Sequence, residues 1–201
     1  MGGVVSVPTM VAVLDGCKSN STSTGGVFSL SKDYQTLVAE IAEIIIPKTD
    51  TPGAKEAGVG PFIELMLKDC YTEIQQKHFV AGLDDVEMEA KKLGSNFLKL
   101  AAEKQIKVIK TMQAKSKEEA KLNDDKKAKQ IDSESGLAKE EQKKKDEVEI
   151  PVPFFKLIKE LTLFGYFTSE PGATKALDYV PIPGRYDACI KMKPGQKAYA
   201  I

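Results

Sequence analysis

Apolar residues recur at the spacing of an α-helix in five segments of this chain, and this periodicity constrains the fold more than any other feature. Residues three, four and seven positions apart lie on one side of a helix, because the helix completes a turn every 3.6 residues. The predicted helices cover approximately residues 31–46, 61–70, 72–93, 100–112 and 153–165. Their apolar stripes are Tyr34, Leu37, Val38, Ile41 and Ile45 in the first helix, Phe62, Leu65, Met66 and Cys70 in the second, Phe79, Leu83, Val86, Ala90 and Leu93 in the third, Ile106, Ile109 and Met112 in the fourth, and Phe154, Leu157, Ile158, Leu161 and Phe164 in the fifth. We therefore expect an all-α fold, a small helical bundle of about five helices.

The sequence between the first two helices, PKTDTPGAKEAGVGP, predicts a stiff corner. Asp50 or Thr51 can cap a short helical turn that has Pro52 at its first position. Gly58 can adopt the left-handed conformation that ends this turn, and Pro61 begins the next helix. Such a corner serves either the packing of the two helices or the presentation of a preorganised surface to a partner. The residues alone do not separate these alternatives.

Residues 115–149 differ in composition from the rest of the chain. They contain 10 Lys and 11 Asp or Glu among 35 residues, and only seven apolar side chains. Such a segment buries too little surface to offset the entropy of ordering it, although pairs of opposite charge four residues apart can support a solvated helix. We expect an exposed helical excursion or a mobile linker, with a docking arm as the functional alternative.

The last part of the chain, from Thr168 onward, predicts an irregular tail. Four prolines and three glycines exclude long regular elements there. Its apolar side chains suggest that it lies against the helices or against a partner; they are Tyr179, Val180, Ile182, Tyr186 and Ile190. The predicted organisation is one helical domain over residues 29–201, with the charged excursion at 115–149 and a leader at 1–28.

Composition and motifs point away from several classes of function. The 29 basic and 29 acidic residues cancel, and 28 of the basic residues are Lys, which argues against a nucleic-acid-binding protein. The single His, His78, and the three Cys show no zinc-binding spacing, and no nucleotide-binding glycine motif or nucleophile elbow is present. Asp50, Glu56, Glu64 and Glu160 lie near loops or apolar faces, but helix capping or surface charge explains each of them. We expect no catalytic residue, metal site or cofactor site in this chain.

The first 28 residues are typical of an export signal followed by a flexible polar tether. Residues 2–14 are mostly apolar or small but too few to span a bilayer, which suits the hydrophobic region of a signal peptide. The sequence LDGC, ending at Cys17, resembles a bacterial lipobox, although Asp15 departs from the usual pattern. We expect export and lipidation of Cys17; the alternative is a frayed terminus without function.

Export would also change the expected state of the other cysteines. Thiols oxidise outside the cytoplasm, and Cys70 and Cys189 then form an even pair. A bridge between them would close a loop of about 120 residues and stabilise the fold by roughly 3–5 kcal/mol. The alternative is that both are small buried apolar residues.

Two blocks of the chain resemble a known family. EIIIPKTDTPGAKEAGVGPFIELML, residues 43–67, and FFKLIKELTLFGYFTSEPGATKALDYVPIPGRYDAC, residues 154–189, are similar to gluconate 2-dehydrogenase subunit 3. With the leader, the resemblance covers about two thirds of the chain and leaves out residues 115–149.

The resemblance implies a small helical subunit of an extracytoplasmic, membrane-associated dehydrogenase complex. The large partner in such complexes is a flavoprotein of the glucose-methanol-choline oxidoreductase type that holds FAD and oxidises sugars or sugar acids, often together with a cytochrome c subunit. The small subunit holds no flavin or haem and helps the large one to mature and to be exported, usually on a twin-arginine signal. This leader lacks the arginine pair. The implied location is the periplasm of a Gram-negative bacterium, with a membrane anchor through the lipid.

Within the resembling blocks, two regions are expected to contact a partner: the corner and the segment that follows the last helix. Arg and Tyr are residue types enriched at interface anchors, although Arg185 could instead cap helix carbonyls within the monomer. The candidate interface residues are Asp50, Pro52, Phe167, Tyr179, Pro183, Arg185 and Tyr186. The alternative function is a stand-alone exported lipoprotein or adaptor with a different partner.

Overall fold

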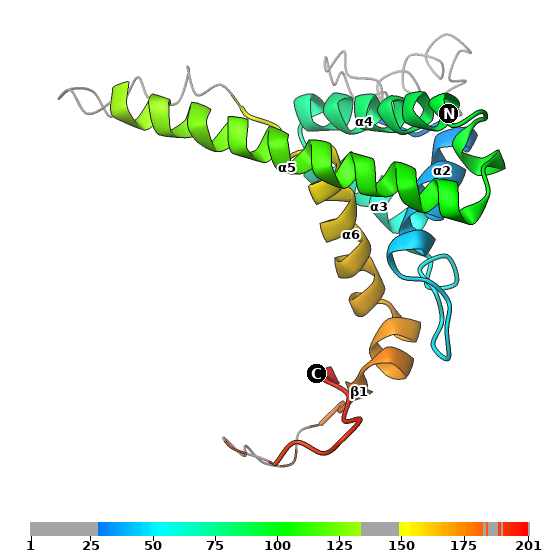
Figure 1. Cartoon of the computed structure of the whole chain (residues 1–201). Helices are drawn as coiled ribbons and strands as arrows, with labels where there is room; N and C mark the ends of the chain where they lie inside the picture. Colours follow the sequence, from blue (N-terminus) through cyan, green and yellow to red (C-terminus); the bar gives the residue numbers. More distant parts are fainter. Residues whose placement is uncertain (1–27, 134–148, 183, 185–188, 190, 201) are drawn as a thin grey trace, which may run out of the picture.

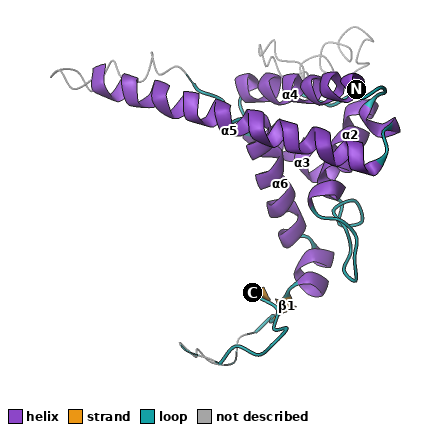
Figure 2. Ribbon diagram, in the orientation of Figure 1, coloured by secondary structure: helices purple, strands orange, loops and turns teal. Residues whose placement is uncertain are grey.

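The computed structural model describes residues 28–133, 149–182, 184, 189 and 191–200. Helices account for most of this part of the chain (Figure 2), so the all-α prediction is confirmed. The elements are α2 (Lys32–Ile45), α3 (Val59–Cys70), α4 (Glu73–Lys92), the short 3-10 helix η1 (Phe97–Lys99), α5 (Ala102–Ser133), α6 (Phe154–Thr168), the π-helical turn η2 (Gly172–Ala176), and the two-residue strands β1 (Asp178–Tyr179) and β2 (Tyr199–Ala200). The strands pair in parallel, with Asp178 opposite Tyr199.

The helices form two layers around one core. α4 and α5 pack side by side, and α2, α3 and α6 form the opposite layer (Figure 1). The middle of the predicted stripes supplies the core: Leu37, Val38 and Ile41 of α2, Phe79, Leu83 and Val86 of α4, and Leu157, Ile158 and Leu161 of α6 are all buried. Ser31 and Thr72 cap α2 and α4 through side chains that accept hydrogen bonds from backbone N–H groups three residues on.

Helix α5 is much longer than the predicted helix at 100–112. It continues through the first half of the charged excursion and projects beyond the two layers (Figure 1). The buried side of α5 is also displaced from the prediction, because Val108 is buried whereas Ile106 is exposed. Residues 134–148 of the excursion lie outside the described part of the chain. None of the described helices is both long enough and apolar enough to cross a bilayer.

The edges of two stripes differ from the prediction as well. Leu65 and Cys70 of α3 and Phe164 of α6 belong to the expected apolar stripes but are exposed. A stripe is wider than the surface that one neighbouring helix covers, so the residues at its margin are buried only where a further element packs there. No described element covers these three.

Candidate partner interface

The corner between α2 and α3 is held from within the monomer. The Tyr166 hydroxyl of α6 donates a buried hydrogen bond of 2.7 Å to the Pro52 carbonyl. The Glu43 carboxylate accepts hydrogen bonds from the backbone N–H groups of Lys48, at 3.0 Å, and Lys55, at 2.8 Å. Gly53 makes this approach possible, since a Cβ there would lie 2.2 Å from the Glu43 carboxylate. Contacts within the monomer therefore hold the corner in place, and Pro52, expected as an interface residue, is buried.

The outer side of the corner is polar and exposed. Lys48 and Glu56 form an ion pair of 2.9 Å, which lowers the pKa of the Glu56 carboxyl and raises the pKa of the Lys48 ammonium. Asp50 is exposed at the tip and accepts a hydrogen bond of 2.9 Å from the Thr49 hydroxyl. Gly58 ends the short turn with φ of 72°, as predicted. Of the two corner candidates, Asp50 remains available to a partner.

The outer side of α6 changes character halfway along the helix. Its first half carries Lys156, Lys159 and Glu160, whereas its second half carries exposed Leu163, Phe164 and Phe167. Phe164 is 53% exposed and Phe167 is 41% exposed. The spacing of 156, 160, 163 and 167 places charged and apolar residues on the same side of the helix, one after the other. The residues of α6 that are buried in the core lie on the opposite side of the helix.

Helix α3 extends this apolar surface. The Phe62 ring lies 5.7 Å from the Phe164 ring, centroid to centroid, in a tilted arrangement. Gly165 allows the two helices to approach, because a Cβ there would lie 2.5 Å from the Phe62 ring. Leu65, one turn further along α3, is 53% exposed. We call the surface formed by Phe62, Leu65, Leu163, Phe164 and Phe167 the α3/α6 apolar face.

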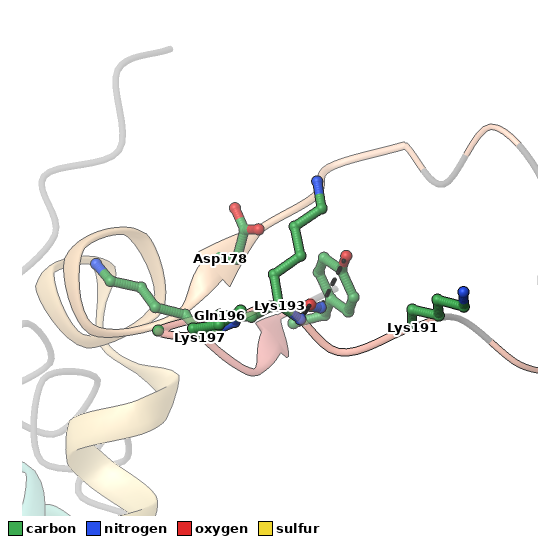
Figure 3. A pocket seen from close by; sticks show the side chains of 8 residues that line it. Asp178, Lys191, Lys193, Gln196 and Lys197 are labelled. Carbon is green, nitrogen blue, oxygen red and sulfur yellow. Dashed lines mark hydrogen bonds between the residues drawn. The ribbon is translucent and has the colours of Figure 1, made fainter.

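The described part of the tail contains an open hollow of about 620 Å³ beside the β1–β2 pair (Figure 3). Its lysines, Lys191, Lys193 and Lys197, point in different directions in this view, and the Lys197 ammonium donates to the Lys175 carbonyl. Small-molecule sites require polar groups that converge on one ligand. The hollow does not meet this requirement. Tyr179, a predicted interface residue, lies on β1 and is exposed.

A second hollow, of about 580 Å³, lies where the start of α2 meets α4 and η1. Three of its polar side chains are engaged inside the protein. The Tyr34 hydroxyl donates to the Asp84 carboxylate, which raises the pKa of Tyr34, and the Glu87 carboxylate accepts from the Phe97 backbone N–H. The arrangement joins α2, α4 and η1 and has a structural role.

His78 lies at a cavity of only about 80 Å³ between α4, α5 and the start of α6. Its Nε2 atom is 3.0 Å from the Glu119 carboxylate, close enough for an ion pair when the ring is protonated. The two groups are not aligned for a directed hydrogen bond, and Nε2 is otherwise buried without a partner. The cavity is several times smaller than typical ligand pockets. Among the described residues, no three His, Cys, Asp or Glu side chains gather as a metal-binding group.

The cysteines do not form the expected bridge. Cys70, at the end of α3, and Cys189, in the tail, are both free and exposed. With Cys17 lipidated, Cys70 and Cys189 would remain as an even pair, but pairing also requires their Cα atoms to lie within about 7 Å of each other. The alternative of two buried apolar residues is also wrong. Cys17, Pro183, Arg185 and Tyr186, and the leader at residues 1–27, lie outside the described residues.

The comparison with protein families gives one match. The model of the family described as gluconate 2-dehydrogenase subunit 3 matches residues 32–184, which are 153 of the 201 residues. The match includes the corner, the α3/α6 apolar face and the whole charged excursion, which the resemblance in sequence had left out. No curated protein and no solved structure matches the chain.

Proposed function

The chain belongs to the gluconate 2-dehydrogenase subunit 3 family, and from this premise we propose that it is a non-catalytic accessory subunit of an exported, flavin-dependent sugar or sugar-acid dehydrogenase. In this proposal the large subunit holds FAD and selects the substrate. The small subunit binds the large one and supports its maturation, export or anchoring.

The observation that carries this proposal is the contrast between a closed core and an open apolar surface. The core residues of α2, α4 and α6 are buried within the monomer, yet aromatic side chains of α6 stay exposed beside those of α3. An exposed apolar patch of a few hundred Å² on a monomer is often functional. The hollows described above lack the enclosed, convergent character of a substrate site.

Binding alone can support maturation of the partner. A subunit that binds the folded form of the large subunit and not its unfolded form stabilises that fold by mass action. Electrons from the substrate would pass through the partner's FAD, and a cytochrome c subunit is the proposed acceptor. No residue of the present chain takes part in that chemistry in this proposal.

The proposed location is the periplasm, with the complex held at the membrane through a lipid on Cys17. Lipidation is testable by metabolic labelling with palmitate. We expect label in the native chain and none in the Cys17→Ser variant. An unlabelled native chain that is recovered wholly in the soluble fraction would contradict the anchor, and would leave the accessory function untouched.

The function itself is tested by isolating the tagged chain from membranes in mild detergent. We expect a larger protein with a flavin absorption spectrum to co-purify, and the preparation to reduce an artificial electron acceptor with a sugar or gluconate. The chain purified alone is the control and should be inactive. Activity of the chain alone, or co-purification only with proteins that hold no flavin, would contradict the proposal.

A further inference from the structure

We infer that the α3/α6 apolar face is the docking surface for one copy of the large dehydrogenase subunit. This inference rests on the proposed function. It names the surface through which the small subunit binds the large one. The partner must offer a concave apolar surface that accommodates the aromatic residues of α6.

The first argument is that the monomer covers these side chains only in part, since Phe164 packs on Phe62 and Phe167 on Tyr166 but both stay largely open to solvent. Phe164 and Phe167 lie on the half of α6 that follows Glu160, where the outer side of the helix loses its charges. Had the whole outer side been solvent-facing, charged residues would be expected to continue along it. Elsewhere on the described surface, large exposed apolar residues lie on other helices, such as Met88 of α4 and Leu122 of α5, and in the tail, at Tyr179, Ile182, Met192 and Tyr199. Single exposed apolar residues are normal.

The second argument is the size of the face. Its exposed fractions leave roughly 350 Å² of apolar surface, since a large apolar side chain presents about 150–250 Å² when it is fully exposed. A standard non-obligate interface buries about 800 Å² per partner, of which about 450 Å² is apolar. An obligate homodimer buries at least about 1,000 Å² per partner, and about 650 Å² of it is apolar. The face fits the first kind of interface and is too small for the second.

The third argument is the charged surround. Lys68 and Asp69 on α3 and Lys159 and Glu160 on α6 are exposed next to the apolar residues in sequence and carry both signs of charge. Non-obligate interfaces have an apolar centre and a polar rim. The occupant is therefore a separately folded protein, and the family to which the chain belongs consists of subunits of a dehydrogenase complex.

The test uses co-purification of the native complex from membranes. The double variant Phe164→Ser with Phe167→Ser should recover at least about tenfold less large subunit than the native chain, because central aromatic residues supply most of the binding energy. The matched control is Met88→Ser with Leu122→Ser, which removes residues that are 51% and 60% exposed on α4 and α5. The control should recover the native amount. The circular dichroism spectrum of each variant reports whether the chain is folded.

A second measurement does not depend on the stability of a variant. A photocrosslinking benzoylphenylalanine at position 167 of the native chain should form an adduct with the large subunit, whereas the same group at position 122 should not. Native recovery by the double variant, or a crosslink between two copies of this chain, would overturn the inference and leave the proposed function standing. Failure of the native chain itself to recover a flavoprotein would refute the proposed function.

Discussion

At the scale of single residues, a few buried polar contacts join segments that are far apart in the sequence. The Tyr166 hydroxyl reaches the Pro52 carbonyl across 114 positions. Gln75 of α4 exchanges two hydrogen bonds with the backbone of Val152, of 3.0 and 2.6 Å. Each contact satisfies a polar group that burial would otherwise leave unpaired. Their partners could not be named from the sequence, because nothing local distinguishes a Tyr or Gln that bonds at long range.

Tyr166→Phe should destabilise the fold by about 1–3 kcal/mol, because the substitution leaves the buried Pro52 carbonyl without its donor. Urea unfolding followed by circular dichroism measures this change. Tyr179→Phe is the matched control, since Tyr179 is exposed on β1 and should change the free energy of unfolding by less than about 0.5 kcal/mol. Equal stability of the two variants would show that the corner does not depend on this bond.

Glu89 provides a prediction about pH. Its carboxylate accepts hydrogen bonds from Lys115 of α5, at 2.7 Å, and Lys92 of α4, at 2.8 Å, and these bonds lower its pKa. A carboxyl whose pKa is lowered on folding stabilises the fold above its unfolded pKa of about 4.3 and loses this contribution as the pH falls through its folded value. The Lys92 and Lys115 side chains are 61% and 45% exposed, so solvent screens both ion pairs and the contribution is below about 1 kcal/mol.

Glu89→Gln should therefore be slightly less stable than the native chain at neutral pH, and the difference should shrink towards zero below about pH 4. Unfolding free energies measured from neutral to acidic pH test this. Glu118→Gln, which alters an exposed carboxylate of α5, is the control and should leave stability unchanged. A difference that grows on acidification would contradict the assigned sign.

At the scale of elements, α5 is longer than its apolar stripe and composition predict. The apolar stripe ends at Met112, and the sequence beyond it cannot contribute much to a core, so the predicted helix stopped there. The helix instead continues to Ser133, because no proline interrupts it and its mixed charges allow favourable pairs one turn apart. The Asn123 amide donates to the Pro151 carbonyl, while residues 124–126 are exposed.

A chain in which residues 127–147 are replaced by a short Gly/Ser linker should keep its thermal unfolding midpoint within a few degrees. Its helical circular dichroism signal should fall, because residues 127–133 of α5 contribute helical signal, whereas the replaced sequence offers few apolar side chains for a core. The matched control is Ile109→Ala in the packed half of α5, which should cost about 2–5 kcal/mol. A large drop in the midpoint of the shortened chain would mean that the outer part of α5 packs on the body.

At the scale of the whole molecule, two layers of helices close a core in which the two described cysteines form no covalent bridge. The exposed thiols of Cys70 and Cys189 lie in separate elements, at the end of α3 and in the tail. Stability must therefore come from the packing of α2, α3, α4, α5 and α6. The tail is connected to this core through η2, which packs against α6.

Titration with a thiol reagent tests this arrangement. In a Cys17→Ser chain isolated without reductant, two thiols should react in the folded protein, and the number should not rise after denaturation or reduction. The Cys70→Ser variant should lose one reactive thiol and keep its unfolding midpoint. If no thiol reacted before reduction and two reacted afterwards, Cys70 and Cys189 would form a disulfide and the prediction would be wrong.

The residues alone were enough to derive the helical class, the corner with Gly58 in the left-handed region, and the family. The helical class and the corner follow from periodicity and from backbone preferences that act over a few residues, whereas the family follows from the similarity of two sequence blocks. Packing was needed to show that Pro52 is buried, that Phe164 and Leu65 are exposed, and that the two cysteines stay apart. Burial at the margin of a stripe depends on where the neighbouring helices cross, and that position is set by contacts between residues distant in the chain.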